Sequence, residues 1–374
     1  ANGIGTFEYA PPTDYVALCS SNLTTTDIAP TKSQQADDNF NTVVYTGNGS
    51  TQSITAVGFQ PNWTWIKNRD QNDSNVLTDS VRGVTKELQS DTATDEITNA
   101  DGLTSFDTNG FSLGADVAYN TSTESYVSWN WKMGTAFSND ASATGVGTID
   151  STGSVNTTNG QAIISYTGTG SAGTIAHGLN SAPDWIMVKN RDDNSKNWNV
   201  HVPALGNTYL ELNNGTAGFT GSSYFNNTAP TDSVFSVGTA GSTNASTDAF
   251  IAYVFHSVEG YSKYGVYVGN ADANGTFVHL GFRPRWLMIK DAANTNIEWN
   301  IYYDESGGGG SFNVMNDYIN AGGNAAAEQT NVSTRNLDFL SNGFKLRDAN
   351  AQNYSANHVY MAFATAPFKF SNAR

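Results

Sequence analysis

The chain has 374 residues, 12% of them aromatic, and a formal net charge of −16 from 18 Lys+Arg and 34 Asp+Glu. An acidic surface repels phosphate groups and no apolar stretch is long enough to span a bilayer, so we expect neither nucleic-acid binding nor membrane insertion. The aromatic content argues against disorder, and the single cysteine, Cys19, excludes an intrachain disulfide framework.

The first predicted element is an extended N-terminal arm over residues 1–38. The segment Ala29–Asp38 is low in apolar residues, as linkers are.

The next feature is a strand-like run that occurs three times. It reads PNWTWIK from Pro61, PDWIMVK from Pro183 and PRWLMIK from Pro284. The copies are spaced by about 100–120 residues, which indicates a repeat of domain size and not a short solenoid period. We call these runs the Pro-x-Trp strands.

Each Pro-x-Trp strand is flanked by similar segments in the same order. A strand with glycines precedes it (Val43–Ser50, Ile163–Ser171, Tyr264–Gly275), and a short strand (Gly110–Leu113, Val234–Val237, Gly343–Leu346) and an aromatic closing strand (Tyr126–Trp131, Phe250–Phe255, His358–Phe363) follow it. The sequence therefore predicts an all-β protein of three tandem antiparallel β-sandwich domains of the jelly-roll or concanavalin-like type. Their ranges are 39–135, 160–258 and 262–370, with a linker over 136–159, and we call them repeats 1, 2 and 3.

Side chains alternate between the two faces of a strand, so the repeated aromatic residues predict a core. The expected core residues are Trp63, Trp65, Trp129, Trp131, Trp185, Tyr253, Phe255, Trp286 and Phe363. The opposite face of the Pro-x-Trp strand is also apolar, and extra strands, neighbouring domains or other subunits must cover it. We therefore expect a homo-oligomer, with a trimer as the favoured form.

Two segments differ from the strand pattern. Ser80–Ser90 is compatible with a short helix that Gly83 interrupts. Ser306–Ser311, SGGGGS, is expected to be a flexible loop tip.

The motifs also carry a resemblance. The pattern GFQPNWTWIKNRD, SVRGVTKELQS, LTSFDTNGFSLG and YVSWNWKMG in repeat 1 resembles an uncharacterised repeated domain of structural proteins in tailed, particularly marine, bacteriophages. Ile4–Leu23 resembles the exit of a SPRY/concanavalin-like domain. The resemblance implies a virion-surface or tail-fibre protein with virion proteins as partners, and it implies a further domain before Ala1. It supplies no catalytic residues.

The residues themselves indicate little chemistry. The five histidines form no metal-binding spacing, no G-x-S-x-G elbow occurs, and Cys19 has no recognisable partner histidine. We expect no cofactor and no enzymatic activity. His177 and His279 stand at matching positions, which favours a recurring structural hydrogen bond over a site. Glu87, Asp91, Asp95 and Glu96 are expected to form a solvated face.

Two weaker binding candidates remain. Asn270, Asp272 and Asn274 alternate as in the first half of a calcium loop, but the acidic residue that would complete it is absent, so a hairpin tip is the better interpretation.

The strand exit KNRD, at Lys67–Asp70 and Lys189–Asp192, predicts an Asx-rich turn. Non-repeating tyrosines are candidates for stacking on sugars, namely Tyr209, Tyr224, Tyr302, Tyr303 and Tyr318.

The favoured function is a non-enzymatic, extracellular virion component that contributes to host attachment, with a host-surface glycan as a candidate ligand. A secreted carbohydrate-binding or glycoside-hydrolysing protein is the main alternative. A bacterial surface filament subunit is the third.

Overall fold

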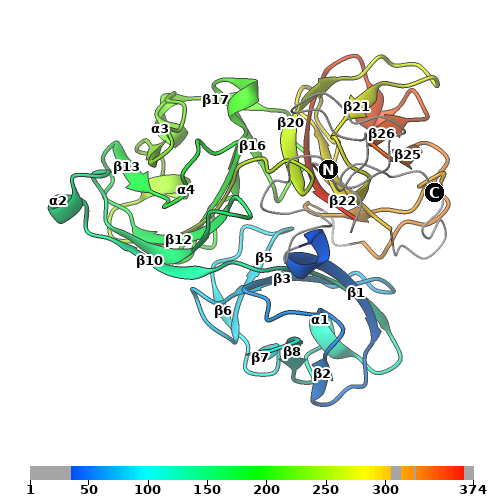
Figure 1. Ribbon diagram of the computed structural model, residues 1–374, viewed down its shortest axis with the longest axis horizontal. Helices are drawn as coiled ribbons and strands as arrows, with labels where there is room; N and C mark the ends of the chain where they lie inside the picture. Colours follow the sequence, from blue (N-terminus) through cyan, green and yellow to red (C-terminus); the bar gives the residue numbers. More distant parts are fainter. Residues whose placement is uncertain (1–34, 305–312, 324–325, 366–374) are drawn as a thin grey trace, which may run out of the picture.

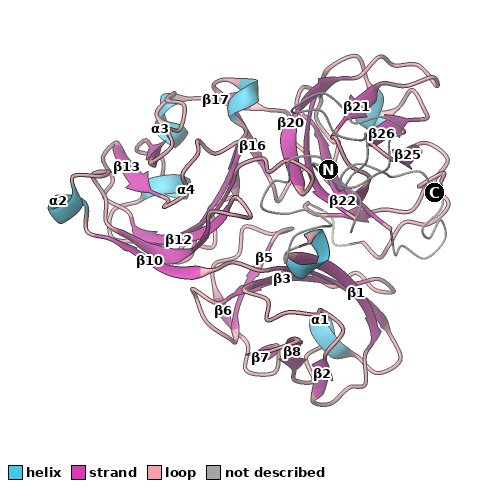
Figure 2. Ribbon diagram, viewed as in Figure 1, coloured by secondary structure: helices cyan, strands magenta, loops and turns pink. Residues whose placement is uncertain are grey.

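The computed structural model describes residues 35–304, 313–323 and 326–365. The protein is all-β, and its described helices are single turns of three or four residues (Figure 2). No described helix has the length and apolar character needed to cross a membrane. Cys19, the predicted loop tip Ser306–Ser311 and most of the predicted arm lie outside the described residues.

Three large antiparallel sheets contain most of the strands, and the strands of each sheet follow one another in spatial order below. The first comprises β1 (Phe40–Thr46), β9 (Ser125–Trp131), β3 (Trp63–Asn68), β4 (Val76–Asp79), β5 (Lys86–Gln89) and β6 (Ile97–Thr98). The second comprises β10 (Thr135–Asn139), β11 (Ser151–Asn156), β12 (Gln161–Thr167), β19 (Ala249–Phe255), β14 (Trp185–Asn190), β15 (Asn199–His201), β16 (Thr208–Glu211) and β17 (Phe219–Thr220). The third comprises β20 (Ser262–Val268), β27 (Asn357–Ala364), β22 (Pro284–Asp291), β23 (Asn300–Tyr303) and β24 (Ile319–Asn320).

Smaller elements complete each repeat. The small sheets are β2 (Gln52–Ile54) with β8 (Gly110–Leu113) and β7 (Leu103–Asp107), then β13 (Gly173–Ala176) with β18 (Val234–Val237), then β21 (Phe277–His279) with β26 (Gly343–Leu346) and β25 (Leu337–Leu340). The helical turns are η2 (Ala36–Asp38), α1 (Val117–Asn120), α2 (Ala141–Thr144), η3 (Pro203–Leu205), α3 (Ser222–Phe225), α4 (Gly241–Asn244) and η4 (Ala351–Asn353).

The three Pro-x-Trp strands have equivalent places in the three large sheets. Each is β3, β14 or β22 and pairs with the aromatic closing strand, β9, β19 or β27. The first tryptophan pairs with an aromatic residue in each sheet: Trp63 with Trp131, Trp185 with Phe255, and Trp286 with Phe363. The sequence repeat is therefore also a repeat of strand pairing.

The Trp-bearing faces of the three sheets share a single core. All nine expected core residues are buried, and all nine belong to one hydrophobic cluster that draws on all three repeats. In repeats 1 and 2 the other face of the strand packs under the small sheet in a separate cluster, around Ile66 in repeat 1 and around Ile186 and Val188 in repeat 2. Figure 1 shows the blue–cyan, green and yellow–red groups of strands meeting at the centre of the molecule.

Aromatic rings from different repeats touch at this centre. Trp63 of repeat 1 stacks on Tyr253 of repeat 2 with ring centroids 4.6 Å apart. Trp131 and Trp286 meet edge to face at 5.9 Å, which joins repeat 1 to repeat 3. Phe255 lies 5.6 Å from Tyr264, which joins repeat 2 to repeat 3. The opposite faces of the Pro-x-Trp strands, which suggested a homo-oligomer, are also buried within the chain, at Ile186 and Val188 in repeat 2 and at Leu287 and Ile289 in repeat 3.

The contacts between repeats form a closed ring with the same backbone hydrogen bond at each junction. Glu96 N donates to Arg191 O at 2.9 Å, Gly218 N to Ala292 O at 2.8 Å, and Glu328 N to Arg69 O at 2.9 Å. In each bond the acceptor is the residue that directly follows the Pro-x-Trp strand of the next repeat. The donor lies near the last strand of the large sheet of the preceding repeat. The third bond runs from repeat 3 back to repeat 1. The ring is therefore closed between repeats 3 and 1.

Two of the three junctions add an ion pair to this bond. Arg191 contacts Glu96 at 2.9 Å, and Arg69 contacts Glu328 at 2.7 Å. At the junction of repeats 2 and 3 the corresponding residues are Ala292 and Gly218, which carry no charge. The ion pairs therefore reinforce a junction geometry that also forms without them.

Two expectations about elements were wrong. The predicted linker 136–159 contains β10 and β11, which extend the second sheet as an antiparallel hairpin joined to β12. The predicted helix at Ser80–Ser90 is a turn followed by β5, because Gly83 has a positive φ of 95° and Lys86–Gln89 pairs with β4 and β6. In β5, pairing with the neighbouring strands outweighed the weak local preference for a helix.

Candidate functional site

The predicted sugar-stacking tyrosines are mostly unsuitable. Tyr209, Tyr302 and Tyr303 are fully buried, so no ring face is open to a sugar, and the expectation for these three is corrected. Tyr318 is also buried. Tyr224 is half-buried and packs edge to face on Phe219 at 4.7 Å.

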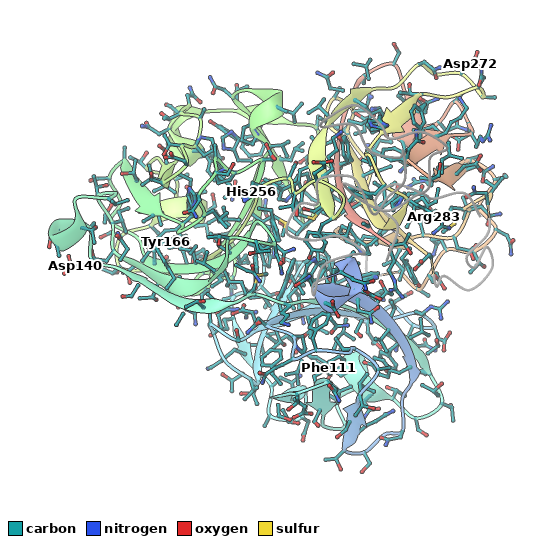
Figure 3. The ribbon with its side chains drawn as sticks, in the orientation of Figure 1. Phe111, Asp140, Tyr166, His256, Asp272 and Arg283 are labelled. Carbon is teal, nitrogen blue, oxygen red and sulfur yellow. The ribbon has the colours of Figure 1, made fainter. Side chains whose placement is uncertain are left out.

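The calcium candidate is an exposed loop between β20 and β21 (Figure 3). Asn270 Oδ1 accepts from Asp272 N at 3.1 Å, and Asp272 Oδ1 accepts from Asn274 N at 2.7 Å. Asn353 Nδ2 also donates to Asn270 Oδ1 at 2.8 Å. These oxygens therefore stabilise the turn, and the described residues contain no group of three or more His, Cys, Asp or Glu that could hold a metal.

The strand exits are Asx turns, as predicted. Asn68 Oδ1 accepts from Asp70 N at 3.0 Å, and Asn190 Oδ1 accepts from Asp192 N at 2.9 Å. In repeat 3 Asp291 Oδ1 takes the same role for Ala293 N at 2.7 Å. The KNRD motif is structural in both of its copies.

The histidines do not repeat a hydrogen bond. His177 is buried, and its Nδ1 accepts from Leu179 N at 3.1 Å, whereas the side chain of His279 is exposed. The expectation of a recurring bond was therefore wrong. Burial lowers the pKa of both His177 and His201 to about 4, so both rings are neutral at pH 7.

Three of the four acidic residues expected to form a solvated face, Glu87, Asp91 and Glu96, instead hold repeat 1 together or join it to repeat 2. Glu87 is buried and accepts from the Tyr119 hydroxyl at 3.1 Å. Asp91 accepts from Asn75 N at 2.8 Å, and Glu96 pairs with Arg191. These three carboxylates therefore stabilise the fold and the junction between repeats 1 and 2.

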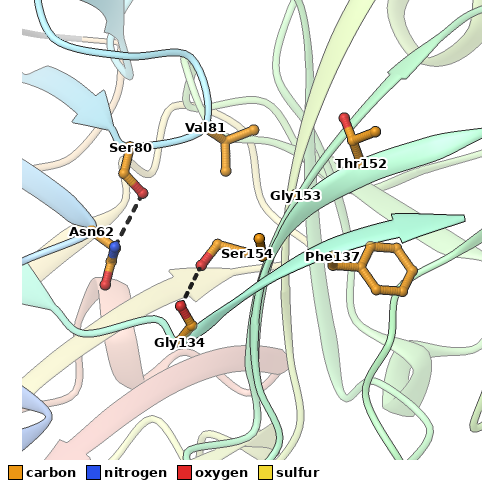
Figure 4. A pocket seen from close by; sticks show the side chains of 9 residues that line it. Asn62, Ser80, Val81, Gly134, Phe137, Thr152, Gly153 and Ser154 are labelled. Atoms are coloured by element: carbon orange, nitrogen blue, oxygen red, sulfur yellow. Dashed lines mark hydrogen bonds between the residues drawn. The ribbon is translucent and has the colours of Figure 1, made fainter.

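A hollow of about 380 Å³ lies between repeats 1 and 2 (Figure 4). We call it the hydroxyl hollow. Its lining residues are uncharged and mostly small: Asn62, Ser80, Val81, Gly134, Ala136, Phe137, Thr152, Gly153 and Ser154.

The two walls of the hydroxyl hollow come from different repeats. Asn62 and Ser80 lie on one side, where Asn62 Nδ2 donates to Ser80 Oγ at 3.2 Å. Gly134 and Ser154, from the β10–β11 hairpin, lie on the other side (Figure 4). None of the side chains that line the hollow carries a carboxylate, imidazole, thiol or amine, so the hollow offers no general acid or general base of these kinds.

A second hollow, of about 370 Å³, lies beside it, and we call it the Phe137 hollow. Its lining includes more apolar residues: Phe137, Asn139, Val146, Ala176, Gly178, Leu179, Asn180, Asp232 and Ser233. Phe137 lines both hollows, and in Figure 4 its ring points away from Asn62 and Ser80. The strand β10 therefore separates two hollows.

Sequence reasoning missed this site because it treated 136–159 as a linker. The strands β10 and β11 are rich in Ser, Thr, Ala and Gly, so they lack the apolar alternation by which a strand is recognised. Phe137 and Val155 were the available signals, and two apolar residues are too few to define a period.

Repeat 3 exposes apolar side chains where repeats 1 and 2 do not. Phe277 is 43% exposed, and its register partner Lys345 corresponds to Ser112 and Ser236, so Phe277 takes the place of Ser53 and Thr174. By the same comparison Val268, 59% exposed, takes the place of Thr46 and Thr167.

Tyr354 extends this exposed surface. It is 37% exposed, and its carbonyl oxygen lies against Gly269, which directly follows Val268. Thr121 and Ala245 hold the matching contacts with Gly47 and Gly168. We call Val268, Phe277 and Tyr354 the repeat 3 patch.

Comparison with known proteins gives a family and no function. No curated protein matches the sequence. Residues 35–367, which span all three repeats, match the family described as "Domain of unknown function (DUF7483)". The chain therefore belongs to the DUF7483 family.

Proposed function

We propose that this protein is a non-enzymatic structural component of a bacteriophage virion, exposed on a tail fibre, spike or capsid surface. The observation that carries the proposal is how the polar residues are used. The charged groups singled out in the sequence hold turns and junctions together, and the hydroxyl hollow between repeats 1 and 2 is lined by uncharged residues. Such a molecule is suited to assembly and not to acid–base chemistry.

The finer architecture belongs to the same proposal. We infer that each repeat is an antiparallel β-sandwich of the jelly-roll or concanavalin-like type, because a large sheet faces a small one across an apolar layer in repeats 1 and 2. A bacterial surface filament subunit has the same physical requirements and differs in the particle to which it belongs.

Localisation tests the virion role directly. Antibodies raised against the purified chain are expected to label particles of the source phage in electron micrographs, at a constant place on each particle. Labelling of the bacterial cell surface in the absence of phage would instead support the filament subunit. Labelling of neither would overturn both.

The repeat 3 patch favours host attachment through a glycan. Aromatic rings present flat apolar faces that suit sugar rings, and Phe277 and Tyr354 are exposed beside a loop rich in Asn and Asp. We infer that this end of repeat 3 binds a neutral or weakly basic saccharide.

The other repeats supply a matched test. Phe277→Ser introduces the residue found at the matching position of repeat 1, Ser53. This variant is expected to bind a glycan array at least tenfold more weakly, without a change in the thermal midpoint. The mirror variant, Ser53→Phe, is the control and should bind as the wild type does. Glycan binding that persists unchanged in Phe277→Ser would place attachment elsewhere.

A hydrolase is the competing function, and product analysis separates the two. Incubation of the chain with bacterial polysaccharides and capsules is expected to release no reducing ends. Reproducible release that a single carboxylate substitution abolishes would establish a glycosidase.

A further inference from the structure

The strand β10 is an open edge of the second sheet. It pairs with β11 on one side, and no other backbone hydrogen bond reaches Thr135–Asn139 among the described residues. Such an edge presents a row of N–H and C=O groups that another strand can pair with. Charged side chains often block such edges, but the residues of β10 are Thr, Ala, Phe, Ser and Asn.

The two hollows make this edge suitable for an added strand. In a strand successive side chains point to opposite faces, so Ala136 and Ser138 share the face of the hydroxyl hollow while Phe137 faces the Phe137 hollow. A strand added beside β10 would place its own alternate side chains over these same two hollows. Backbone pairing with pockets for alternate side chains is the general form of strand addition.

A second copy of β10 matches these hollows. In an antiparallel pair centred on Phe137, Ala136 lies opposite Ser138 of the other copy and Thr135 lies opposite Asn139. The small side chains then meet over the hydroxyl hollow. The two phenyl rings meet over the Phe137 hollow, where Val146, Ala176 and Leu179 extend the apolar surface.

Charge favours the same pairing. Lys132 precedes β10 and Asp140 follows it, and both are at least partly exposed. Antiparallel pairing brings the Lys132 end of one copy to the Asp140 end of the other. Opposite charges therefore meet at both ends of the paired strands, whereas a parallel arrangement would place like charges together.

We propose that the free edge of β10 pairs antiparallel with β10 of a second copy, centred on Phe137, and joins two eight-stranded sheets into one. The inference rests on the assembly role that the proposed function gives to the chain, and it names one surface that assembly would use. A five-residue edge buries less area than a standard stable interface, so the dissociation constant is expected on the order of 100 µM. Copies held side by side on a particle would have an effective concentration above this dissociation constant, so they would pair.

The first test is sedimentation of the purified full chain from 1 to 500 µM. We expect a monomer–dimer equilibrium that Phe137→Lys weakens at least tenfold, because a lysine would face its own copy across the two-fold axis. Val117→Lys, at the most exposed apolar position of α1, makes the same change of charge and should dimerise as the wild type does. Far-UV circular dichroism establishes that both variants are folded.

The second test looks for the appearance of a covalent dimer, so it does not depend on the stability of Phe137→Lys. Opposed residues in an antiparallel pair have Cβ atoms about 4.5–5.5 Å apart, within reach of a disulfide after small adjustment. In a Cys19→Ser background, oxidised Phe137→Cys is expected to give a covalent dimer, and Val117→Cys is not.

The outcomes separate the edge from the wider proposal. A chain that stays monomeric to 500 µM and gives no Phe137→Cys cross-link overturns the pairing. An oligomer whose dissociation constant is unchanged in Phe137→Lys also overturns the pairing. That result would not contradict the structural virion role, since assembly would then use another surface.

Discussion

Three lysines, Lys67, Lys189 and Lys290, have the same position in the three large sheets, and each side chain is buried. Their ammonium groups donate to backbone carbonyls, for example Lys189 Nζ to Asn190 O at 2.7 Å and Lys290 Nζ to Asp291 O at 2.7 Å. Desolvation lowers the pKa of all three to about 8, while nearby carboxylates oppose that shift. The repeat thus preserves an ionisable group at a site that disfavours its charge.

This burial predicts that the protein becomes more stable in mild alkali. Between about pH 8 and 10 the unfolded chain keeps its lysine protons while the folded chain releases three, so the free energy of unfolding rises with pH. Above pH 10 the buried tyrosines reverse the trend, because burial raises the pKa of residues such as Tyr253. Urea titrations from pH 7 to 10 measure the slope.

Two variants control for other groups that titrate in this range. Lys290→Met should remove about a third of the slope, since it deletes one of three equivalent groups. Lys196→Met, at a partly exposed position, should leave it unchanged. Stability that is flat or falling between pH 8 and 10 would show that these lysines stay charged.

The central tryptophans predict a contrast between two substitutions. Trp286 Nε1 has no hydrogen-bond partner among the described residues, while its ring contacts Phe40, Trp129, Trp131 and Phe363. Trp286→Ala should therefore cost about 3–5 kcal/mol through lost packing. Trp286→Phe keeps a ring, deletes no described hydrogen bond and should cost far less. Equal losses in chemical denaturation would mean that the indole N–H matters more than the ring.

Single residues also mark the limit of sequence reasoning. The burial of the nine core aromatics followed from their recurrence in alternating strands. The burial of Tyr302 and Tyr303 did not, because Tyr303 contacts Glu328 and Trp129, and Tyr302 contacts Tyr318, all distant in sequence. A residue that occurs in one repeat gives no internal comparison.

Among the elements, the Pro-x-Trp strand and the closing strand could be predicted and the β10–β11 hairpin could not. In repeats 2 and 3 the first two carry apolar residues on both faces, so their composition alone distinguishes them. The strands of the hairpin have Phe137, Ala136 and Val155 among small polar residues and Gly153, and they form because β12 offers β11 an edge to pair with. The candidate site therefore lay in the segment with the weakest local signal.

The junction elements predict a strong coupling between two residues. Arg191→Ala should destabilise by about 2–3 kcal/mol, because it leaves Glu96 half-buried with fewer partners. Arg191→Ala/Glu96→Ala should cost less than the two single changes together, since it approaches the uncharged junction at Ala292 and Gly218. A double-mutant cycle in urea measures the difference. Additive losses would mean that the pair contributes little beyond its separate contacts.

At the scale of the whole molecule, sequence established that the outer faces of the strands needed cover and left open what covers them. The alternatives were extra strands, neighbouring domains and other subunits. The small sheets of the same repeat cover these faces in repeats 1 and 2, whereas neighbouring repeats cover the Trp-bearing faces. The second arrangement depends on ring closure between repeats 3 and 1, which no local pattern encodes. Arg69 and Glu328, far apart in the chain, meet only because the ring closes.

Because one hydrophobic core is shared by all three repeats, we expect them to unfold as one thermodynamic unit. Separating any repeat from the other two would expose indole and phenyl rings to water at roughly 25 cal/mol per Å² of apolar surface. Partial unfolding of one repeat is therefore expected to be unfavourable under conditions in which the other two are folded.

Differential scanning calorimetry of the full chain tests this claim most directly. We expect a single transition whose calorimetric and van't Hoff enthalpies agree, since all three repeats lose their common core together. Two or three separable transitions, or a calorimetric enthalpy several times the van't Hoff value, would contradict it and would show that the repeats fold as independent domains on a string.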